Sequence, residues 1–536
     1  MHPSAWLRIP ETTRLSRRAD LALFALGCLG LAFLLAQLVD YPHGRDQAIF
    51  GVVAATSLEG GTPYADAWDF KPPGIYVLYG IAQMLFGKGQ VAIRLLEAAS
   101  IVTMIGAFAL LSKRFAGGIG PGLVGGLVAT LGWVELEFWN TAQPESFAAS
   151  LLAWALVAAT YRSEVQSRQH LAQILAGALY AAAALQKPHL GVGIAISWLV
   201  SFSAAKPRTW ASAVSYAAGF ILPLGMTAAW LVSKEAWDDF YQTLFEWIPG
   251  YTNISTHDSA LPSRIFKAVY LWLVGFSPFH LPGLMLWVAL PRLAPPESKC
   301  AYHLLAILAP ILFGIAYQGK FFEYHFGTVI PLAGLLAGWG YWKAWIRLRT
   351  TPLGLLFATG ISLAILLGAV PTRNNGPAAY WHRCGVRATL WADPTGTQDL
   401  RDRLYSNAES PAGPRRKVAA WLSKNTSPQS KVFVWGFEPG IYQQSDRTPA
   451  SRYIYNVAQR VGWDTAIHRA RLLEDLRINQ PAAIVIQTGD RLPWVTGNPR
   501  DSHEELAHFQ ELQQWLAMHY ESAITIDNLE IWVPRN

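Results

Sequence analysis

Long apolar stretches separated by short polar segments recur along residues 21–370 of the chain. Each stretch has about 16 to 25 residues, which is long enough, or nearly so, for a helix to cross a hydrocarbon layer about 30 Å thick. The pattern predicts about eleven membrane-spanning helices. We place them roughly at residues 21–39, 91–112, 117–135, 146–161, 171–186, 190–205, 210–232, 266–290, 301–317, 326–345 and 352–370.

After residue 370 the pattern becomes typical of a small α/β domain, in which β-rich runs alternate with amphipathic ones. We expect strands at 431–437 and 482–487, helices at 415–425, 471–480 and 504–520, and a hairpin at 524–533 that turns at Asp527-Asn528. The predicted fold is therefore a mainly α, polytopic transmembrane protein with a C-terminal extracytoplasmic α/β domain. Its parts are a cytoplasmic tail (1–20), a transmembrane domain (21–370) and the α/β domain (371–536).

Two long loops interrupt the apolar pattern on the predicted exterior side. The first, residues 40–90, contains an apolar run from Ile75 to Phe86 that is too short to span a membrane and is bounded by Pro73 and Gly87. We expect this run to lie along the membrane surface with Tyr76 and Tyr79 at headgroup level. The second loop, Ser233 to Arg264, is rich in Trp, Tyr and acids, and we interpret it as a partly ordered flap.

Composition agrees with a membrane protein. Of 536 residues, 52% are apolar, 15% are charged and 23 are tryptophan, which is unlike a single water-soluble core. The net charge of +7 gives no argument for nucleic acid, because much of the basic excess is explained by membrane topology and by an arginine-rich tail domain. The three cysteines provide neither a disulfide framework nor a metal signature.

The basic residues also predict the orientation. With the N-terminus in the cytoplasm, alternate loops carry most of the Lys and Arg, and the opposite loops are richer in acids, as the positive-inside bias requires. The first apolar stretch follows several arginines and has no small-residue cleavage site, so we interpret it as an anchor. The basic loop residues are Lys113, Arg114, Arg162, Arg168, Lys206, Arg208, Arg292, Lys299, Lys343, Arg347 and Arg349.

Ionisable residues gather at the predicted exterior ends of the helices. They are Asp46, Asp69, Lys71, Glu145, Lys187, His189, Lys320, Glu323 and His325. Charges commonly accumulate where helices meet water, and this explanation competes for each residue. However, Lys71 precedes Pro72-Pro73 and Glu145 follows Pro144, and prolines fix the direction of the neighbouring chain. Ionisable groups near a membrane are costly unless they pair or line a wet cavity, so the group indicates a site.

These residue types fit the chemistry of a lipid phosphate. A carboxylate beside a cavity accepts a proton from an attacking hydroxyl, while lysines and histidines stabilise a departing phosphate. Lysine suits phosphate because it is a compact point charge. The residues alone therefore indicate an exterior enzyme that handles a lipid phosphate.

The run from Arg45 to Gly118 resembles the beginning of membrane glycosyltransferases of the GT-C fold, in the bacterial group related to protein O-mannosyltransferases and the lipid A aminoarabinose transferase. The shared features are an acid after the first helix (Asp46), the Lys71-Pro72-Pro73 sequence and the Pro144-Glu145 pair. Residues 320–338 are similar to a late-helix motif of this group, and VWGFEPGIYQQSDRTPASRYIYN in the tail is weakly similar.

The resemblance implies a role for each matching residue. Asp46 would be the catalytic carboxylate, Lys71 a contact to the phosphate of the lipid carrier and Glu145 a supporting acid. Such enzymes use polyprenyl-phosphate sugars and invert the anomeric centre by direct displacement. Asp46 would then act as general base, unless the acceptor is itself a phosphate.

The sequence also departs from these relatives. Gln47 stands where the mannosyltransferases carry a second acid, and Phe70 stands where the aminoarabinose transferase carries an acid before the lysine. Asp69 would have to substitute, which leaves the need for a divalent metal open. Four further phosphate contacts, each with an ordinary helix-end role as the alternative, are Lys187, His189, Lys320 and His325.

The sequence therefore predicts a bacterial inner-membrane glycosyltransferase that moves a sugar from a polyprenyl-phosphate donor to an exported lipid, glycan or protein, with the α/β tail helping to hold this acceptor. The alternatives are a transporter or flippase for a lipid-linked or anionic substrate, and an inactive assembly subunit. A transporter should carry ionisable residues near the bilayer midplane, and the predicted helices are nearly free of them.

Overall fold

The computed structural model describes residues 13–200, 210–257, 259–275, 279–366, 377–393, 398–406 and 410–535. The chain forms two compact units, each built from three separate segments. Unit 1 comprises Met1–Tyr41, Ile93–Met226 and Ala260–Gly385, and unit 2 comprises Pro42–Ala92, Thr227–Ser259 and Val386–Asn536. The boundary expected at 370/371 lies outside the described residues, and the two units divide within α18 (Pro377–Ala392).

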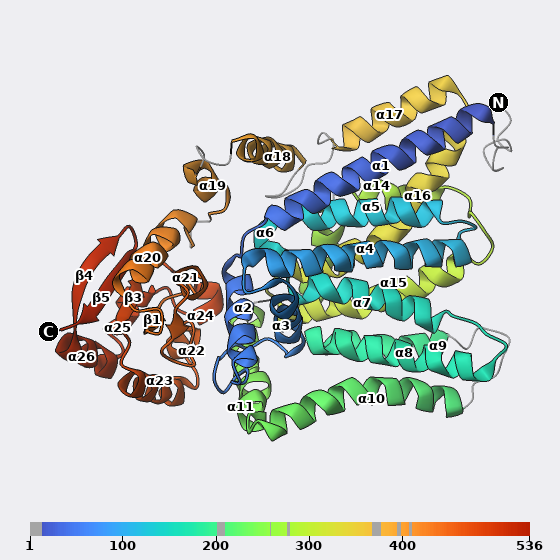
Figure 1. Ribbon diagram of the computed structural model, residues 1–536. Coiled ribbons are helices and arrows are strands. Elements are labelled where there is room, and N and C mark those ends of the chain that lie inside the picture. The colour runs from blue at the N-terminus through green and yellow to red at the C-terminus, as the bar shows by residue number, and fades with distance from the viewer. Residues whose placement is uncertain are drawn as a thin grey trace. The chain divides into compact units, whose positions relative to one another are not determined.

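Unit 1 is a bundle of helices (Figure 1). Four helices of the described chain, α1, α4, α10 and α15, are long and apolar enough to cross a membrane, and several shorter apolar helices accompany them. The predicted multi-helical membrane fold is confirmed. The helices are α1 (Arg14–Asp40), α4 (Gln90–Phe115), α5 (Gly120–Val134), α6 (Glu137–Asn140), α7 (Pro144–Ala159), α8 (Gln166–Gln186), α9 (Gly193–Val200), α10 (Trp210–Ser233), α13 (Leu261–Tyr270), α14 (Leu281–Ala289), α15 (Glu297–Gln318), α16 (Val329–Leu348) and α17 (Pro352–Leu366). The first residues of α4 and the last residues of α10 belong to unit 2.

One expected crossing is wrong. Residues 266–290 do not form a single helix, because α13 continues into the π-helical turn η5 (Leu271–Gly275) and α14 begins only after a turn at Phe279 and His280. Pro282 lies in the first turn of α14, where its missing N–H is tolerated, whereas inside a longer helix it would break the hydrogen-bond ladder. The ends of two other expected crossings, 201–205 and 367–370, lie outside the described residues.

Helix α16 lies at the centre of unit 1, and most of its side chains are buried. It packs closely on α5 because both helices carry glycines at the contact. A Cβ on Gly338 would lie only 2.2 Å from the backbone of Gly125, so a larger residue would push the helices apart. The short 3₁₀ turn η6 (Glu323–Gly327) comes directly before α16. Because α16 is closely packed, its position also limits where this turn lies.

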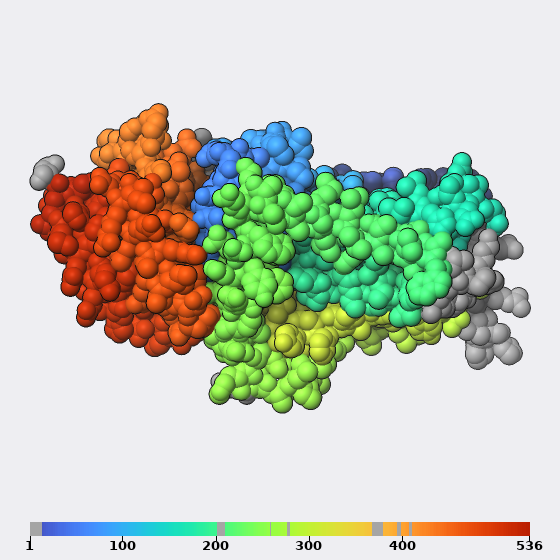
Figure 2. Space-filling model, turned by 90° about the horizontal axis from the view of Figure 1, so that it is seen from below, coloured from blue at the N-terminus to red at the C-terminus, as the bar shows by residue number. Residues whose placement is uncertain are grey.

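Unit 2 combines the two long loops with the α/β part. Its five-stranded sheet has the order β2-β1-β3-β5-β4, in which β1 pairs in parallel with β2 and β3, and β5 is antiparallel to β3 and β4. Figure 2 shows the packed side chains of the C-terminal residues in orange to red. The strands are β1 (Lys431–Trp435), β2 (Thr448–Pro449), β3 (Ala483–Gln487), β4 (Tyr520–Ile526) and β5 (Leu529–Pro534).

The helices of unit 2 cover this sheet and form the two loops. They are α2 (Arg45–Leu58), α3 (Gly74–Phe86), α11 (Trp237–Tyr241), the π-helical η4 (Gln242–Trp247), α12 (Ile248–Thr256), α19 (Gln398–Leu404), α20 (Ala412–Asn425), α21 (Gly440–Ser445), α22 (Val457–Arg460), α23 (Thr465–Asn479), α24 (Pro493–Thr496), α25 (Ser502–Leu506) and α26 (Gln510–His519).

Most expected elements of the tail are confirmed, including both buried strands and the hairpin, which turns at Asp527 with a φ of 53°. The expected helix 504–520 is wrong, because it is divided into α25 and α26. Phe509 lies between them with its side chain 1% exposed, and its ring lies under the Arg469 guanidinium, 4.8 Å away. Burial of this ring requires the chain to leave the helical path.

The apolar run in the first loop forms the expected helix α3, which ends at Gly87 with a φ of 84°. The expectation that Tyr76 and Tyr79 lie at headgroup level is wrong, because both are buried inside unit 2 at 3% and 1% exposure. Their hydroxyl and ring partners within this unit, described below for Tyr76, hold them inward. The exposed apolar residues of α3 are Val77, Met84, Leu85 and Phe86.

Candidate functional site

Asp46 lies in the first turn of α2, where the partial positive charge at a helix N-terminus favours a carboxylate. Its side chain is half-buried. The residues around it dock on the α/β part of the same unit. The His43 Nδ1 atom lies 2.8 Å from the Gln443 Oε1 atom, and the Arg45 guanidinium lies 4.3 Å from the centre of the Phe437 ring. The start of α2 is thus held by the tail segment that carried the weak resemblance.

Asp69 and Lys71 are held by three tyrosines. The Tyr455 hydroxyl donates to Asp69 Oδ1 at 2.6 Å and the Tyr76 hydroxyl donates to Asp69 Oδ2 at 2.8 Å. The Tyr64 hydroxyl donates to the Lys71 carbonyl at 2.8 Å, and the Lys71 N–H donates to the Tyr76 hydroxyl at 3.2 Å. These hydrogen bonds therefore fix the backbone of the Lys-Pro-Pro segment at Lys71.

The segment before Lys71 is surrounded by aromatic rings of unit 2. The Trp68 N–H donates to the Arg452 carbonyl at 2.7 Å, and the Trp68 ring lies 5.1 Å from Trp247 and 5.8 Å from Tyr455, between centroids. Such offset and edge contacts between aromatic rings stabilise a packed arrangement. The Lys71 Nζ atom lies 5.6 Å from the centre of the Phe70 ring.

Burial and neighbouring charges shift the pKa values of Tyr455 and Asp69. Burial, and then the charge of Asp69, raise the pKa of the Tyr455 hydroxyl well above its usual value, and the charge of Asp46 adds to this shift. Burial also raises the pKa of Asp69, although hydrogen bonds and the charge of Lys71 oppose the shift. The structure thus brings three predicted residues, Asp46, Asp69 and Lys71, into one neighbourhood. Sequence reasoning missed Tyr455, although it lies in the RYIYN run that appeared familiar.

Asp69 alone does not make a metal site, and both of its oxygens accept hydrogen bonds from tyrosine hydroxyls. Within the described part of the chain, no group of three or more His, Cys, Asp and Glu side chains is arranged to hold a metal ion. We therefore derive no step through a metal.

The second group of predicted residues lies in unit 1, where three helix ends meet. Lys187 and Glu145 form an ion pair, and their side chains are only 11% and 2% exposed. Glu145 lies in the first turn of α7 and Lys187 caps the C-terminus of α8. The Lys187 Nζ atom also donates to Gln318 Oε1 of α15 at 3.4 Å. The pair therefore joins α7, α8 and α15.

The η6 turn packs against the start of α7. The Thr328 hydroxyl donates to the Glu145 carbonyl at 2.8 Å, and Asn140 Nδ2 donates to Glu323 Oε2 at 2.7 Å. The His325 ring is buried and lies 4.6 Å from the Tyr324 ring, between centroids. Burial lowers the pKa of Lys320, which precedes this turn, to about 8.

His189 has different surroundings within unit 1. Its ring lies against Gly314 of α15, so closely that a Cβ there would lie 2.7 Å from His189 Cδ2. His189 follows Lys187 by only two positions, but the two side chains have different partners. Lys187 pairs with Glu145, whereas the His189 ring packs against Gly314.

The sequence analysis did not single out a buried pair in α4, Arg94 and Glu97, whose side chains are both 0% exposed. Arg94 donates to the Phe138 carbonyl at 3.0 Å, and Glu97 accepts from Trp133 Nε1 at 2.8 Å. Glu97 also accepts from the backbone N–H of Ala142, whose φ is 53°. The pair thus shapes the loop that leads to Pro144 and Glu145. The sequence did contain a signal for this pair, because Arg94 and Glu97 are charged residues within the apolar span expected at 91–112.

No protein-family model matches the chain, and no curated protein matches it. Among solved structures, the chain is similar to ArnT from Cupriavidus metallidurans in the apo state, with 16% identity and a TM-score of 0.56 over 96% of this chain and 98% of that one. It is also similar to the same protein bound to undecaprenyl phosphate, with 14% identity and a TM-score of 0.58 over 96% and 97% of the two chains. The chain therefore has the fold of ArnT over nearly its full length.

Proposed function

We propose that the protein is a membrane glycosyltransferase that moves a sugar from a polyprenyl-phosphate donor to an exported acceptor, with inversion at the anomeric carbon. The observation that carries this proposal is that Asp46, Asp69 and Lys71 belong to one compact unit, in which Tyr455 is bonded to Asp69 and feels the charge of Asp46, and Asp69 feels the charge of Lys71. The fold supports the choice of donor, because the protein of similar fold is described bound to undecaprenyl phosphate, which is a polyprenyl phosphate.

In the proposed reaction, an acceptor hydroxyl attacks the anomeric carbon from the face opposite the phosphate. The bond between this carbon and the phosphate oxygen breaks, and its electron pair leaves with the polyprenyl phosphate. Asp46 accepts the hydroxyl proton as general base. Where the acceptor is itself an ionised phosphate, no proton has to be removed and Asp46 has no base role.

Lys71 would stabilise the phosphate as negative charge develops on it. A preorganised cation acts best when it does not have to reorganise during the reaction. A hydrogen bond from the Tyr64 hydroxyl to the Lys71 carbonyl and one from the Lys71 N–H to the Tyr76 hydroxyl fix the backbone of Lys71 in advance. Asp69 is then a positioning residue, because it holds this segment without itself contacting the reacting atoms.

For the phosphate contacts predicted in unit 1, the structure weakens the case for Lys187 and His189, and the roles of Lys320 and His325 stay predictions. The charge of Lys187 is already offset by Glu145, and the ring of His189 is packed against Gly314. The role proposed for Glu145 is to hold α7 and α8 together at the end of the bundle that carries these residues.

We also propose that the protein lies in a bacterial inner membrane with its N-terminus in the cytoplasm and its α/β part outside. Arg114, Arg162 and Lys299 belong to three different loops expected in the cytoplasm. They line one cavity of about 250 Å³ in unit 1, so these loops meet at a single end of the bundle. A shared basic end agrees with the positive-inside bias.

The donor role of Lys71 is tested by binding of undecaprenyl phosphate to the purified protein in detergent, measured by native mass spectrometry. Loss of a charge-assisted contact in Lys71→Ala should weaken binding by about tenfold or more. The matched control is Lys88→Ala, because Lys88 belongs to the same unit and forms an exposed ion pair with Glu59. Binding should be unchanged in this control. Unchanged binding in Lys71→Ala would remove Lys71 from the donor site.

A further inference from the structure

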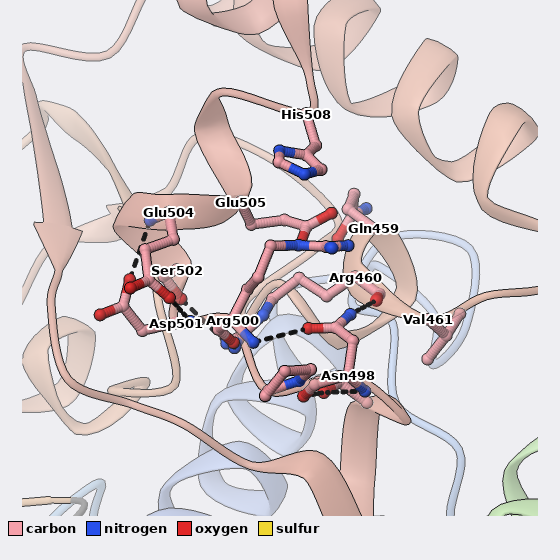
Figure 3. Close-up of polar contacts among 12 residues, drawn as sticks. Gln459, Arg460, Val461, Asn498, Arg500, Asp501, Ser502, Glu504, Glu505 and His508 are labelled. Atoms are coloured by element: carbon pink, nitrogen blue, oxygen red, sulfur yellow. Dashed lines mark hydrogen bonds and ion pairs between the residues drawn. The ribbon is translucent and has the colours of Figure 1, made fainter.

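Unit 2 contains a cavity of about 580 Å³ that none of the proposed transfer residues lines. Its walls come from α12, from the turn between α22 and α23, from the segment after α24 and from the end of α25. Figure 3 shows Arg460, Asn498, Arg500, Glu505 and His508 gathered around this region. Its volume is in the range of sites that bind small molecules.

The cavity has an excess of positive charge. Arg460, Arg469 and Arg500 line it, and Glu505 is the only carboxylate among the lining residues, all of which are described. Glu505 is shared, because Arg469 Nη2 donates to one of its oxygens at 2.9 Å and Arg500 Nε donates to the other at 2.7 Å. Arg460 is balanced by the buried Asp490 at 2.8 Å. Two carboxylates therefore pair directly with the three guanidinium groups, and a third, Asp501, acts on Asp490 without forming an ion pair with an arginine of the cavity wall.

The excess charge is presented by Arg500. The donors of Arg469 are used within the fold, by Glu505 and by the carbonyls of Gln459 and His508. The side chain of Arg500 is 36% exposed, and its Nη groups make no hydrogen bond to any residue that the structure describes. Paired guanidinium donors match the two oxygens of a phosphate or carboxylate group.

The remaining walls suit a sugar ring. The half-buried indole of Trp463 is anchored by a hydrogen bond from its Nε1 to the Trp247 carbonyl at 3.1 Å, and it offers an apolar surface. Asn253 and His508 are exposed lining residues whose side chains can exchange hydrogen bonds with hydroxyl groups. A cation, an aromatic surface and neutral polar groups thus occur together in one cavity.

We propose that this cavity binds a saccharide that carries a negatively charged phosphate or carboxylate group, with its charge on Arg500 and its ring against Trp463. This binding does not require the proposed sugar transfer and is measured without it.

The test is calorimetric titration of the full-length protein in detergent with glucose 6-phosphate, glucuronic acid, maltose and inorganic phosphate. At least one of the two charged sugars should bind, and the tighter one identifies the preferred anionic group. Maltose and inorganic phosphate should each bind at least about tenfold more weakly than the charged sugar. Maltose lacks the anionic group, and inorganic phosphate lacks the sugar ring. Binding of neither charged sugar, or equally tight binding of inorganic phosphate, would overturn the proposal.

Two variants localise the site. Arg500→Gln should weaken binding of the charged sugar by about tenfold or more. Asn253→Asp, a change at an exposed position, should also weaken it through charge repulsion without disturbing the Arg500 ion pair. The control is Arg491→Gln, which removes the same charge from an exposed ion pair with Glu504 outside the cavity, and which should bind as the wild type does. Wild-type affinity in both Arg500→Gln and Asn253→Asp would contradict the proposal.

Discussion

Asp69 and Tyr455 determine how the Lys-Pro-Pro segment is presented. The sequence indicated Asp69 and Lys71 because an acid and a lysine stand next to two prolines. It did not connect them with Tyr455, which lies 386 positions away in the weakly similar tail segment and donates to Asp69 at 2.6 Å. Pairing of such distant residues depends on the tertiary fold, whereas proline acts on its neighbours in the chain.

Replacement of Tyr455 by Phe should therefore affect both stability and donor binding. It leaves a buried oxygen of Asp69 without its hydrogen bond, which should lower the free energy of unfolding of unit 2 by about 1–3 kcal/mol. Tyr453→Phe is the control, since it removes a hydrogen bond of 2.8 Å to His468 in the same segment. Both variants should lose thermal stability, but only Tyr455→Phe should bind undecaprenyl phosphate more weakly. Equal donor binding in the two variants would contradict a positioning role for Tyr455.

Lys320 gives a prediction about pH. Burial lowers its pKa to about 8, so its ammonium group loses its proton as the pH rises through this value. If Lys320 contacts the donor phosphate, the affinity for undecaprenyl phosphate should decrease between about pH 7 and pH 9. In Lys320→Arg the guanidinium stays charged over this range, so the decrease should be smaller. Titrations of both proteins at a series of pH values measure this, and parallel curves would exclude Lys320.

At the scale of helices, the Glu145–Lys187 pair joins the start of α7 to the end of α8. Because both side chains are largely buried, removal of one partner leaves an uncompensated charge. Glu145→Gln should lower the free energy of unfolding of unit 1 by about 3–5 kcal/mol. The double variant Glu145→Gln with Lys187→Met should recover much of this loss, because no buried charge remains. Thermal unfolding of Glu145→Gln, Lys187→Met and the double variant tests this, and additive effects of the two single changes would show that the pair is not coupled.

The apolar pattern predicted most helices of the bundle and the two central strands. Segments that are buried in a membrane or in a sheet consist of apolar runs of a typical length, and such runs can be recognised in the sequence. The pattern failed where tertiary packing decided the outcome. Phe509 is drawn into the core of unit 2 and divides an expected helix. Tyr76 was expected at the membrane surface because it is amphipathic, but its hydroxyl is bound to Asp69.

At the scale of the whole molecule, the division into two units does not follow the order of the sequence. The loops at residues 42–92 and 227–259 belong to the same unit as the α/β part. The apolar pattern predicted a membrane part followed by a separate tail, because it records burial and carries no information about which loop packs on which domain. The candidate residues could therefore be proposed from the sequence, but their division between unit 1 and unit 2 could not.

This grouping predicts shared stability within unit 2. Ile486 of β3 is 1% exposed, and Ile486→Ala should cost about 2–5 kcal/mol. Hydrogen exchange should then become faster in α2 and in residues 67–71 as well as in the sheet, while α7 and α8 stay protected. The control is Leu336→Ala in α16 of unit 1, also 1% exposed, which should have the reverse effect. Unchanged exchange in α2 in the Ile486 variant would show that the loop does not share the stability of the sheet.

The central claim is that Asp46 is the base of a sugar transfer, and its most direct test is the envelope glycan and lipid profile of cells that carry Asp46→Asn at an unaltered protein level. Glu59→Gln is the matched control, because Glu59 follows the other end of α2 and forms an exposed ion pair with Lys88. We predict that Asp46→Asn reproduces the profile of cells that lack the gene and that Glu59→Gln reproduces the wild type. An Asp46→Asn profile identical to wild type in every glycan and lipid fraction would contradict the claim.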